Sequence, residues 1–572
     1  MSQSELEKPT IELSSNKSSS IEEPTKLDNY ENEFASSSIE EPGKIHTFLG
    51  MSGTHLNLAI SSFGAVGFLL FGYDQGVMGS LLTLTSFTRQ FPSISQNTRH
   101  SATLQGTVIS IYEIGCCVTA LSTVFLAEHF GRLKLMFIGC VIVIIGAVLQ
   151  ATAFTITHLA IARVVTGFGT GFLTATVPVW SAELSKAKSR GRLIMMEGSL
   201  ITAGIAISYW IDFGFYFITK TSNDPHGIAW RIPIIIQVVF PIALICFVFK
   251  FPESPRWLMG KGRVREARII FSAVYGLSED HEKINDQLAE IQSALELERS
   301  ESVGFNIVEL CRQGPARNFH RLSLACWSQI FQQITGINLI TVRTIFEKYV
   351  HMSPFTSRIL AACNGTEYFL ASIIGIFIIE HRWFGRRRLL VWGAFGQALV
   401  MMALTIAGWQ AQVKIDRGES STQAGIAAAF FLFAFNTVFG MSYLGCAWLY
   451  PPEISSLGLR AATAGLSTAC NWIFNFMVVM VTPIMFGNIQ YYTYCVFACI
   501  NFLMGITAYI FYPETRGRTL EEIDFIFNQC PVNQPWKVVA IEKKTPYRDS
   551  HEDIEKPKME HIDNIDKNSS MK

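Results

Sequence analysis

The stretch GFGTGFLTATVPVWSAELSKAKSRGR, residues Gly167–Arg192, carries the pattern that decides the fold. Its apolar, glycine-spaced part is followed by Glu183 and, seven residues later, by Arg190. The same order returns far downstream in CAWLYPPEISSLGLRAA, with Glu453 and, seven residues later, Arg460. Each acid and arginine follow an apolar span of about 20 residues, the length of a membrane-crossing helix. The recurrence predicts one unit used twice, as in membrane proteins built from two facing halves.

The composition favours a membrane protein. Of the 572 residues, 49% are hydrophobic and only 16% are charged, against roughly 25% charged in soluble domains. Lysine and arginine together equal aspartate and glutamate at 46 each, so no excess of positive charge points to nucleic acid. The 12 cysteines form no C-x-x-C motif, and we expect no disulfide framework, no metal and no cofactor.

The apolar residues fall into twelve blocks separated by polar segments, which predicts an all-α membrane protein. The predicted spans are 56–80, 104–127, 135–154, 158–180, 193–217, 231–251, 322–346, 357–380, 388–408, 423–448, 462–486 and 490–512. They divide the chain into a disordered N-terminal tail (1–50), a first half (51–251), a central loop (252–321), a second half (322–512) and a C-terminal tail (513–572). The first tail is rich in serine and glutamate and repeats SSSIEEP, a composition that cannot bury a core.

The positive charges of the short loops predict the orientation. With the N-terminus inside, the inner loops carry eleven lysines and arginines and the outer loops carry six. Because cytoplasmic loops are enriched in these residues, we expect both tails and the central loop in the cytoplasm.

Further motifs occur in pairs at the predicted inner ends of the spans. EHFGRLK (128–134) matches HRWFGRRR (381–388), and PESPRWL (252–258) matches PETRGRTLEE (513–522). Their charged side chains are expected to join helix ends in a charge network. Its predicted members are Arg132, Glu183, Arg190, Glu253 and Arg256 in the first half, and Arg386, Glu453, Arg460, Glu514 and Arg516 in the second.

These paired strings, together with QQITGIN (332–338), resemble the sugar porter family of the major facilitator superfamily over roughly residues 55–535. FGYDQGVM (71–78), EGSLITAGIAISYWIDFG (197–214) and LYPPEI (449–454) look most like a fungal branch that contains a glycerol–proton symporter. The resemblance implies the major facilitator fold, with twelve transmembrane helices in two six-helix halves. It also implies a plasma-membrane transporter, not an enzyme, that takes up a sugar or polyol, glycerol-like or hexose, with protons.

Two residues inside predicted spans are candidates for proton coupling. Asp74 lies late in the first span and Arg163 early in the fourth. In proton-coupled members of the family the matching residues form a pair that opens when the acid is protonated. The physical reason is that a charged acid attracts the arginine, whereas a protonated acid releases it. Glu197 is a third candidate, with three roles open: binding hydroxyl groups, taking the proton, or pairing with an inner-loop arginine.

The resemblance also places a substrate site among amides and one tryptophan. Amides both donate and accept hydrogen bonds, which suits a neutral polyhydroxyl ligand, and a kink at Gly336 would bring the amides of the seventh span together. The predicted substrate-binding residues are Gln332, Gln333, Asn338, Trp448, Asn471 and Asn475.

The sequence departs from the family at several positions. Val342 and Arg343 replace two tyrosines of the outer gate. We predict that Arg343 either braces the gate against an acid, Glu347 one helical turn on or Glu367, or binds an anionic substrate. In HRWFGRRR the nearest acid, Glu380, lies two residues further from the glycine than the pattern requires, which leaves the acid's place to Arg382.

Three alternatives stand beside proton-coupled uptake. The first is a facilitative carrier of the same fold, in which the Asp74 pair is only structural. The second is a nutrient sensor that binds sugar without transport. The third is a carrier of an organic acid or secondary metabolite, suggested by Arg343. In each case the partners are a small molecule and the lipid bilayer, with protons added if uptake is coupled.

Overall fold

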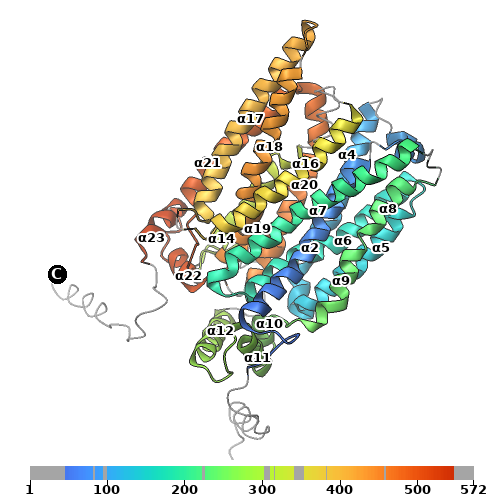
Figure 1. Cartoon of the computed structure of the whole chain (residues 1–572). Helices are drawn as coiled ribbons and strands as arrows, with labels where there is room; N and C mark the ends of the chain where they lie inside the picture. Colours follow the sequence, from blue (N-terminus) through green and yellow to red (C-terminus); the bar gives the residue numbers. More distant parts are fainter. Residues whose placement is uncertain are drawn as a thin grey trace, which may run out of the picture. The chain divides into compact units, whose positions relative to one another are not determined.

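The computed structural model of the chain describes residues 45–81, 84–94, 99–221, 224, 226–301, 310–314, 316–339, 353–381, 383–420, 422–456, 459–518 and 520–546. Within these residues the regular secondary structure is helical (Figure 1). Eleven helical segments there are long and apolar enough to cross a membrane. The seventh predicted span begins in a helix of 17 residues and runs into residues 340–352, which are not among those described.

The first half of the chain, blue to green in Figure 1, supplies six of these spans. Its helices are α2 (Gly53–Leu81), α4 (Arg99–Phe130), α5 (Arg132–Ala151), α6 (Ile156–Leu184), α7 (Ala187–Thr221), α8 (Ile228–Ile236) and α9 (Val239–Phe247), with α3 (Thr85–Gln90), η1 (Pro92–Ile94) and η2 (Val248–Lys250) as short additions. The sixth span is divided between α8 and α9. Pro241 explains this division, because it has no N–H to bond the carbonyl of Gln237 four residues earlier.

The second half, yellow to red in Figure 1, repeats this plan. Its helices are α14 (Asn318–Ile334), η3 (Ile337–Leu339), α16 (Pro354–Ile378), α17 (Arg386–Asp416), α18 (Thr422–Met441), α19 (Tyr443–Ile454), α20 (Arg460–Ile489) and α21 (Tyr492–Phe511). The tenth span is interrupted at Ser442, whose backbone leaves the helical region. The ninth span reaches Asp416, eight residues beyond the end predicted from its apolar block.

Shorter helices lie in the central loop and in the C-terminal segment. They are α10 (Pro255–Gly260), α11 (Val264–Tyr275) and α12 (Glu282–Glu301) in the loop, and α22 (Leu520–Asn528), η4 (Pro535–Lys537) and α23 (Val538–Lys544) after the last span. The segment predicted as a polar tail is therefore folded up to residue 546. Residues 1–44, most of the segment predicted as disordered, are outside the described part.

The glycines of GFGTGF allow α6 to pack closely between two neighbours. A methyl group added at Gly167 would lie 2.1 Å from the carbonyl oxygen of Tyr112 on α4, and one at Gly169 would lie 2.5 Å from the carbonyl oxygen of Gly139 on α5. Side chains larger than hydrogen would force these helices apart, as in other membrane helix pairs with small residues at the contact. The close approach holds Arg163, one turn earlier on α6, against α4.

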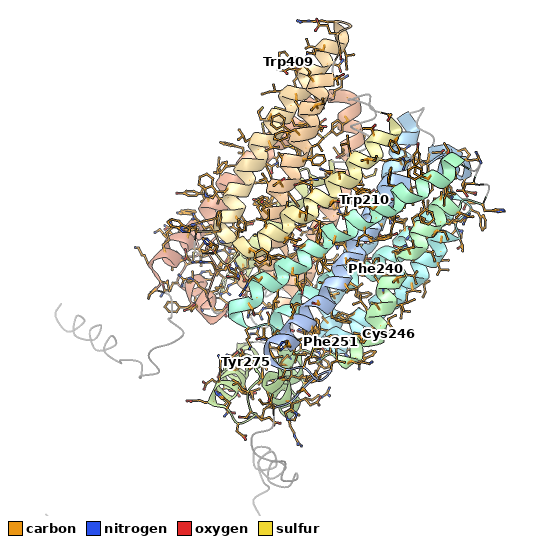
Figure 2. The ribbon with its side chains drawn as sticks, in the orientation of Figure 1. Trp210, Phe240, Cys246, Phe251, Tyr275 and Trp409 are labelled. Carbon is orange, nitrogen blue, oxygen red and sulfur yellow. The ribbon has the colours of Figure 1, made fainter. Side chains whose placement is uncertain are left out.

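The two halves pack against each other through α4 with α20 and through α7 with α16. One of these contacts is polar, because the hydroxyls of Thr202 and Ser372 lie 3.0 Å apart. The outer faces of the spans keep large apolar side chains exposed. Leu399 is 74% exposed, and Trp210 and Trp409, labelled in Figure 2, are about half exposed. Exposed apolar surface on this scale fits contact with lipid.

Candidate functional site

A cavity of about 180 Å³ lies between the two halves. One water molecule needs only ~10–15 Å³ of such space, so the cavity suits a small ligand. The first half contributes Gln75, Tyr112 and Arg163 to its wall. The second half contributes Asn364 and Trp448, among others. A ligand in this cavity would therefore touch both halves.

Three of the predicted amides converge on this cavity because their helix is interrupted. α14 ends at Ile334, and Gly336 adopts a φ of +93°, a conformation that favours glycine, before η3 begins. The bend brings Asn338 back to Gln333, so that Nδ2 of the asparagine donates to Oε1 of the glutamine at 2.6 Å. Gln332, Gln333 and Asn338 all line the cavity. The bend that was expected at Gly336 is present.

Asn471 and Asn475, on α20, lie behind these amides. Asn471 Nδ2 donates to Gln332 Oε1 at 2.7 Å, and its Oδ1 accepts from Gln333 Nε2 at 3.0 Å. Asn475 Oδ1 accepts from Asn338 Nδ2 at 2.6 Å. Both asparagines are buried and neither is part of the cavity lining. In this structure they orient the amides that line the cavity, and the expectation that they face the substrate stays a prediction.

Trp448 lies in the cavity wall and is 3% exposed. Its ring meets Phe68 of α2 edge to face, with ring centroids 5.2 Å apart. Its indole Nε1 is buried and has no hydrogen-bond partner in the described structure. Trp448 therefore offers a ligand both a flat apolar face and a free donor.

Sequence reasoning did not assign a second amide pair in the same wall. Asn436 Nδ2, on α18, donates to Asn364 Oδ1, on α16, at 2.8 Å, and both residues line the cavity. Asn364 Nδ2 and Asn436 Oδ1 are buried without hydrogen-bond partners among the described residues. Gln329, also missed, braces the first amide group, because it accepts from Asn471 Nδ2 at 2.7 Å. The signal available in the sequence was an amide side chain within an apolar span. Burying such a side chain there costs free energy unless it has a partner or a function.

The predicted pair of Asp74 and Arg163 is formed. Nη1 of Arg163 lies 3.1 Å from both carboxylate oxygens of Asp74, and the two side chains are 2% and 1% exposed. The guanidinium also donates to the carbonyl oxygen of Ile109 at 3.2 Å and lies 4.5 Å from the ring centre of Tyr112. Arg163 lines the cavity, whereas Asp74 lies behind it. The ion pair is thus placed at the wall of the cavity.

Glu113 and Glu197 are among the further acids within the spans. Glu113, on α4, lines the cavity, is 3% exposed and has one carboxyl oxygen without a hydrogen-bond partner. Glu197, on α7, is fully buried, and neither of its oxygens has a partner in the described structure. Glu197 is not in the cavity lining and lies close to α2, since a methyl group at Gly64 would be 3.2 Å from its Oε1. This arrangement offers no support for ligand binding or an arginine pair, and proton binding stays a prediction.

The charge network of the first half joins the start of α5 to two other segments. Glu253 accepts the backbone N–H groups of Arg132 and Leu133, each at 3.1 Å. Nη2 of Arg132 lies 3.2 Å from Oε1 of Glu183 at the end of α6. Gly131 precedes the helix with a φ of +84°, and a methyl group there would lie 2.8 Å from the Glu253 carboxylate. The glycine of FGR is thus required by the approach of this acid.

The second half repeats this arrangement. Glu514 accepts the backbone N–H groups of Arg386 and Arg387 at 2.9 and 3.2 Å, at the start of α17. Nη2 of Arg386 lies 2.9 Å from Oε1 of Glu453. Gly385 precedes this helix, and a methyl group there would lie 2.4 Å from the Glu514 carboxylate. The repeated strings therefore fold into two similar sites.

Glu380 occupies the acid's place in the second basic motif after all. Nη2 of Arg386 lies 3.0 Å from Oε1 of Glu380, and Nη1 donates to the other oxygen at 3.1 Å. The suggestion that Arg382 replaces this acid is wrong, because the chain carries Glu380 back to Arg386; Arg382 itself lies outside the described residues. A methyl group at Gly191 of the first half would be 2.0 Å from Glu380. The two halves therefore meet at this ion pair.

The remaining predicted residues are placed as follows. Arg190 and Arg460 are buried near the starts of α7 and α20. Arg256 has one buried guanidinium nitrogen without a hydrogen-bond partner, and Arg516 donates its backbone N–H to Glu514 at 3.1 Å. Arg343, the predicted gate residue, lies outside the described residues, as does Glu347.

Glu253 and Glu514, the two acids that accept backbone N–H groups at the starts of α5 and α17, share one electrostatic feature. Burial raises the pKa of the Glu253 and Glu514 carboxyls, although backbone N–H groups and the neighbouring arginines oppose this shift. They therefore hold protons more readily here than they would in water. In the described part of the chain no three His, Cys, Asp or Glu side chains gather as a metal site would require.

Comparison with known proteins assigns the family. The model of the sugar (and other) transporter family matches residues 60–527. The chain is 38% identical to the sugar transporter STL1 of Saccharomyces cerevisiae, over 90% of this chain and 87% of that protein. It is 35% identical to the major facilitator superfamily transporter mfsA of Aspergillus fumigatus, over 90% of this chain and 92% of that protein.

Among solved structures, the proton:xylose symporter XylE of E. coli, bound to 6-bromo-6-deoxy-D-glucose, matches with a TM-score of 0.71. The match covers 83% of this chain and all of that chain, at 23% identity, and shows the major facilitator fold. Family and fold, as predicted from the motifs, are thus confirmed. The chain belongs to the sugar transporter family of the major facilitator superfamily, and it is a multi-pass membrane transporter rather than an enzyme.

Proposed function

We propose that this protein takes up a small neutral polyhydroxyl compound, a sugar or a polyol, together with protons across the plasma membrane, with both termini in the cytoplasm. One observation carries the proposal. Amides of the second half and Arg163 of the first half line the same cavity, and Arg163 holds the buried carboxylate of Asp74.

The chemistry of the wall favours a neutral ligand with several hydroxyl groups. Its amide groups, together with the indole N–H of Trp448, present both donors and acceptors. The positive charge of Arg163 is already matched by Asp74. An anionic ligand would have to compete for that arginine, and a cationic one would meet it as a like charge.

Coupling follows from the position of the ion pair. While Asp74 is charged, it holds Arg163 and with it the start of α6. A proton on Asp74 removes this attraction and frees the guanidinium, which still has the carbonyl oxygen of Ile109 and the ring of Tyr112 as partners. Because Arg163 faces the cavity, a ligand there responds to the same change. Glu197 is proposed as a second proton-binding group.

The charge network supplies the other half of the cycle. Arg132 with Glu183, and Arg386 with Glu380 and Glu453, hold the predicted cytoplasmic ends of the helices together in this structure. The side chains of Arg132, Glu183, Arg386 and Glu453 are at most 8% exposed, and removing one partner of a buried pair costs about 3–5 kcal/mol, so pairs that break together can bias two states. Opening toward the cytoplasm is proposed to require that they separate. The gating role of Arg343 remains a prediction from the sequence.

The test is transport by the purified protein in liposomes loaded with a pH-sensitive dye. Glycerol, glucose and an organic acid such as lactate are added outside in turn. If uptake is coupled, entry of a polyol or sugar should acidify the interior of the liposomes. A protonophore should change this acidification. Entry without acidification would favour the facilitative carrier. Acidification with the organic acid alone would overturn the substrate class.

A further inference from the structure

A second cavity, of about 380 Å³, lies away from the substrate cavity, between the start of α17 and the C-terminal segment. Its wall is strongly basic. The cationic residues that line it are Arg387, Arg388, Arg516, Arg518, Lys543 and Lys544. Only two acids, Glu514 and Glu542, stand among them. It shares no lining residue with the substrate cavity, although Glu514 and Arg516 in its wall belong to the charge network.

Both acids are already engaged within the protein. Glu542 pairs with Arg518 at 3.1 Å. Glu514 accepts the backbone N–H groups at the start of α17 and that of Arg516. The other five cations form no ion pair with any acid of the described residues. The positive charge of the cavity is therefore left for a ligand.

The wall is held in place by a buried contact. Nη2 of Arg518 donates to the carbonyl oxygens of Glu542 and Thr545 at 2.9 and 3.0 Å, and its side chain is 1% exposed. This fixes the end of α23, which carries Lys543 and Lys544 in its last turn. Figure 1 shows α23 near α21, and the two helices are in contact.

The rim of the cavity lies next to two exposed aromatic side chains. Arg387 donates to the carbonyl oxygen of Tyr509 on α21 at 2.6 Å, and Arg388 donates to that of Trp383 at 2.9 Å. Trp383 is 68% and Tyr509 is 58% exposed. Exposed tryptophan and tyrosine are typical of the level where lipid headgroups meet water.

We propose that this basic cavity binds the phosphorylated headgroup of an anionic membrane lipid. Arginine forks and lysine ammonium groups suit phosphate oxygens, and basic pockets at the cytoplasmic side of membrane helices bind such headgroups. The rim at Tyr509 and Trp383 gives the acyl chains a path into the bilayer. A bound headgroup would touch residues next to Arg386, so it would stabilise the closed arrangement of the charge network.

The experiment uses the full chain in nanodiscs of neutral lipid, with phosphatidylinositol 4,5-bisphosphate added as the probe. The test variant is Lys543→Gln/Lys544→Gln, because both lysines are exposed and outside the transport site. The matched control is Lys261→Gln/Arg265→Gln, two exposed cations of the central loop. At roughly fivefold for each cation removed, the test variant should bind about 25-fold more weakly, and the control should be unchanged.

Three results would overturn the proposal. Wild-type protein that binds this lipid no better than neutral lipid would remove the site. Equal weakening in both variants would mean that diffuse surface charge attracts the lipid. Soluble inositol 1,4,5-trisphosphate that binds as tightly as the lipid would assign the cavity to a free phosphate compound. The thermal stability of both variants is measured in parallel, and a second variant, Arg388→Gln, must reproduce the loss.

Discussion

Asp74→Asn should uncouple transport from protons. The change keeps the shape of the side chain and one oxygen that can still accept from Arg163, but it removes the charge that protonation would remove. Loss of one partner of a buried ion pair costs about 3–5 kcal/mol. We expect about 3 kcal/mol here, because Arg163 keeps the carbonyl oxygen of Ile109 and the ring of Tyr112. Folded protein should therefore still reach the membrane.

The magnitude of the transport effect follows from the driving force. One proton moved through 100 mV supplies about 2.3 kcal/mol, which sustains roughly 50-fold accumulation of a neutral solute. Asp74→Asn should bring this ratio to about one while exchange of labelled for unlabelled substrate continues. The assay is uptake of radiolabelled glycerol and glucose into liposomes with an imposed potential.

Glu367→Gln is the matched control for this prediction. Glu367 is an acid within α16 that accepts a hydrogen bond from Thr437 and does not line the cavity. It should leave accumulation unchanged. If Asp74→Asn still concentrates substrate, or if both variants lose accumulation equally, the Asp74 pair is not the coupling element.

Three further outcomes are expected. Gln333→Ala should weaken apparent substrate affinity about three- to tenfold, the loss of one hydrogen bond; unchanged affinity would place the substrate elsewhere. Glu380→Gln should loosen Arg386 and speed maleimide labelling of the buried Cys446, read by mass spectrometry, roughly two- to fivefold; an unchanged rate would contradict a closing role. Burial and two neighbouring arginines lower the pKa of His320 to about 4. Stability should therefore fall by about 2 kcal/mol between pH 7 and 5, seen as a decrease in Tm that His320→Gln removes.

The sequence predicted the spans well because each is a long apolar block, a signal that does not depend on tertiary contacts. It failed where side chains decide the outcome. The ninth span runs to Asp416 although its last turns contain Gln412 and Lys414, which end the apolar block but continue the helix. The division of the sixth span was readable from Pro241. The interruption at Ser442 carries no comparable signal.

The candidate site was predicted only in part, because side-chain contacts decide which residues line the cavity. Motifs predicted Gln333 and Asn338 as substrate-binding residues, and both line the cavity. They did not separate a residue that faces the cavity from one that lies behind it, as Asn471 does. Nor did spacing show that Glu380 reaches Arg386, because the path of a loop is not fixed by residue counts. Asn364 and Asn436 belong to none of the motifs that carry the family resemblance, and only their proximity identifies them.

The duplicated and the unique parts of the chain perform different tasks. At the predicted inner end, the two halves repeat even their minor contacts. Trp180 donates to the carbonyl oxygen of Pro252 at 3.0 Å, and Tyr450 donates to that of Pro513 at the same distance. At the cavity the repeat is lost, because all of the lining amides except Gln75 come from the second half, whereas the ion pair comes from the first. Closing a two-half protein requires matched ends, whereas recognising one ligand and responding to one proton do not. The asymmetry of the cavity therefore assigns recognition mainly to the second half and coupling to the first, so substitutions in α14 should change affinity and those at Asp74 should change accumulation.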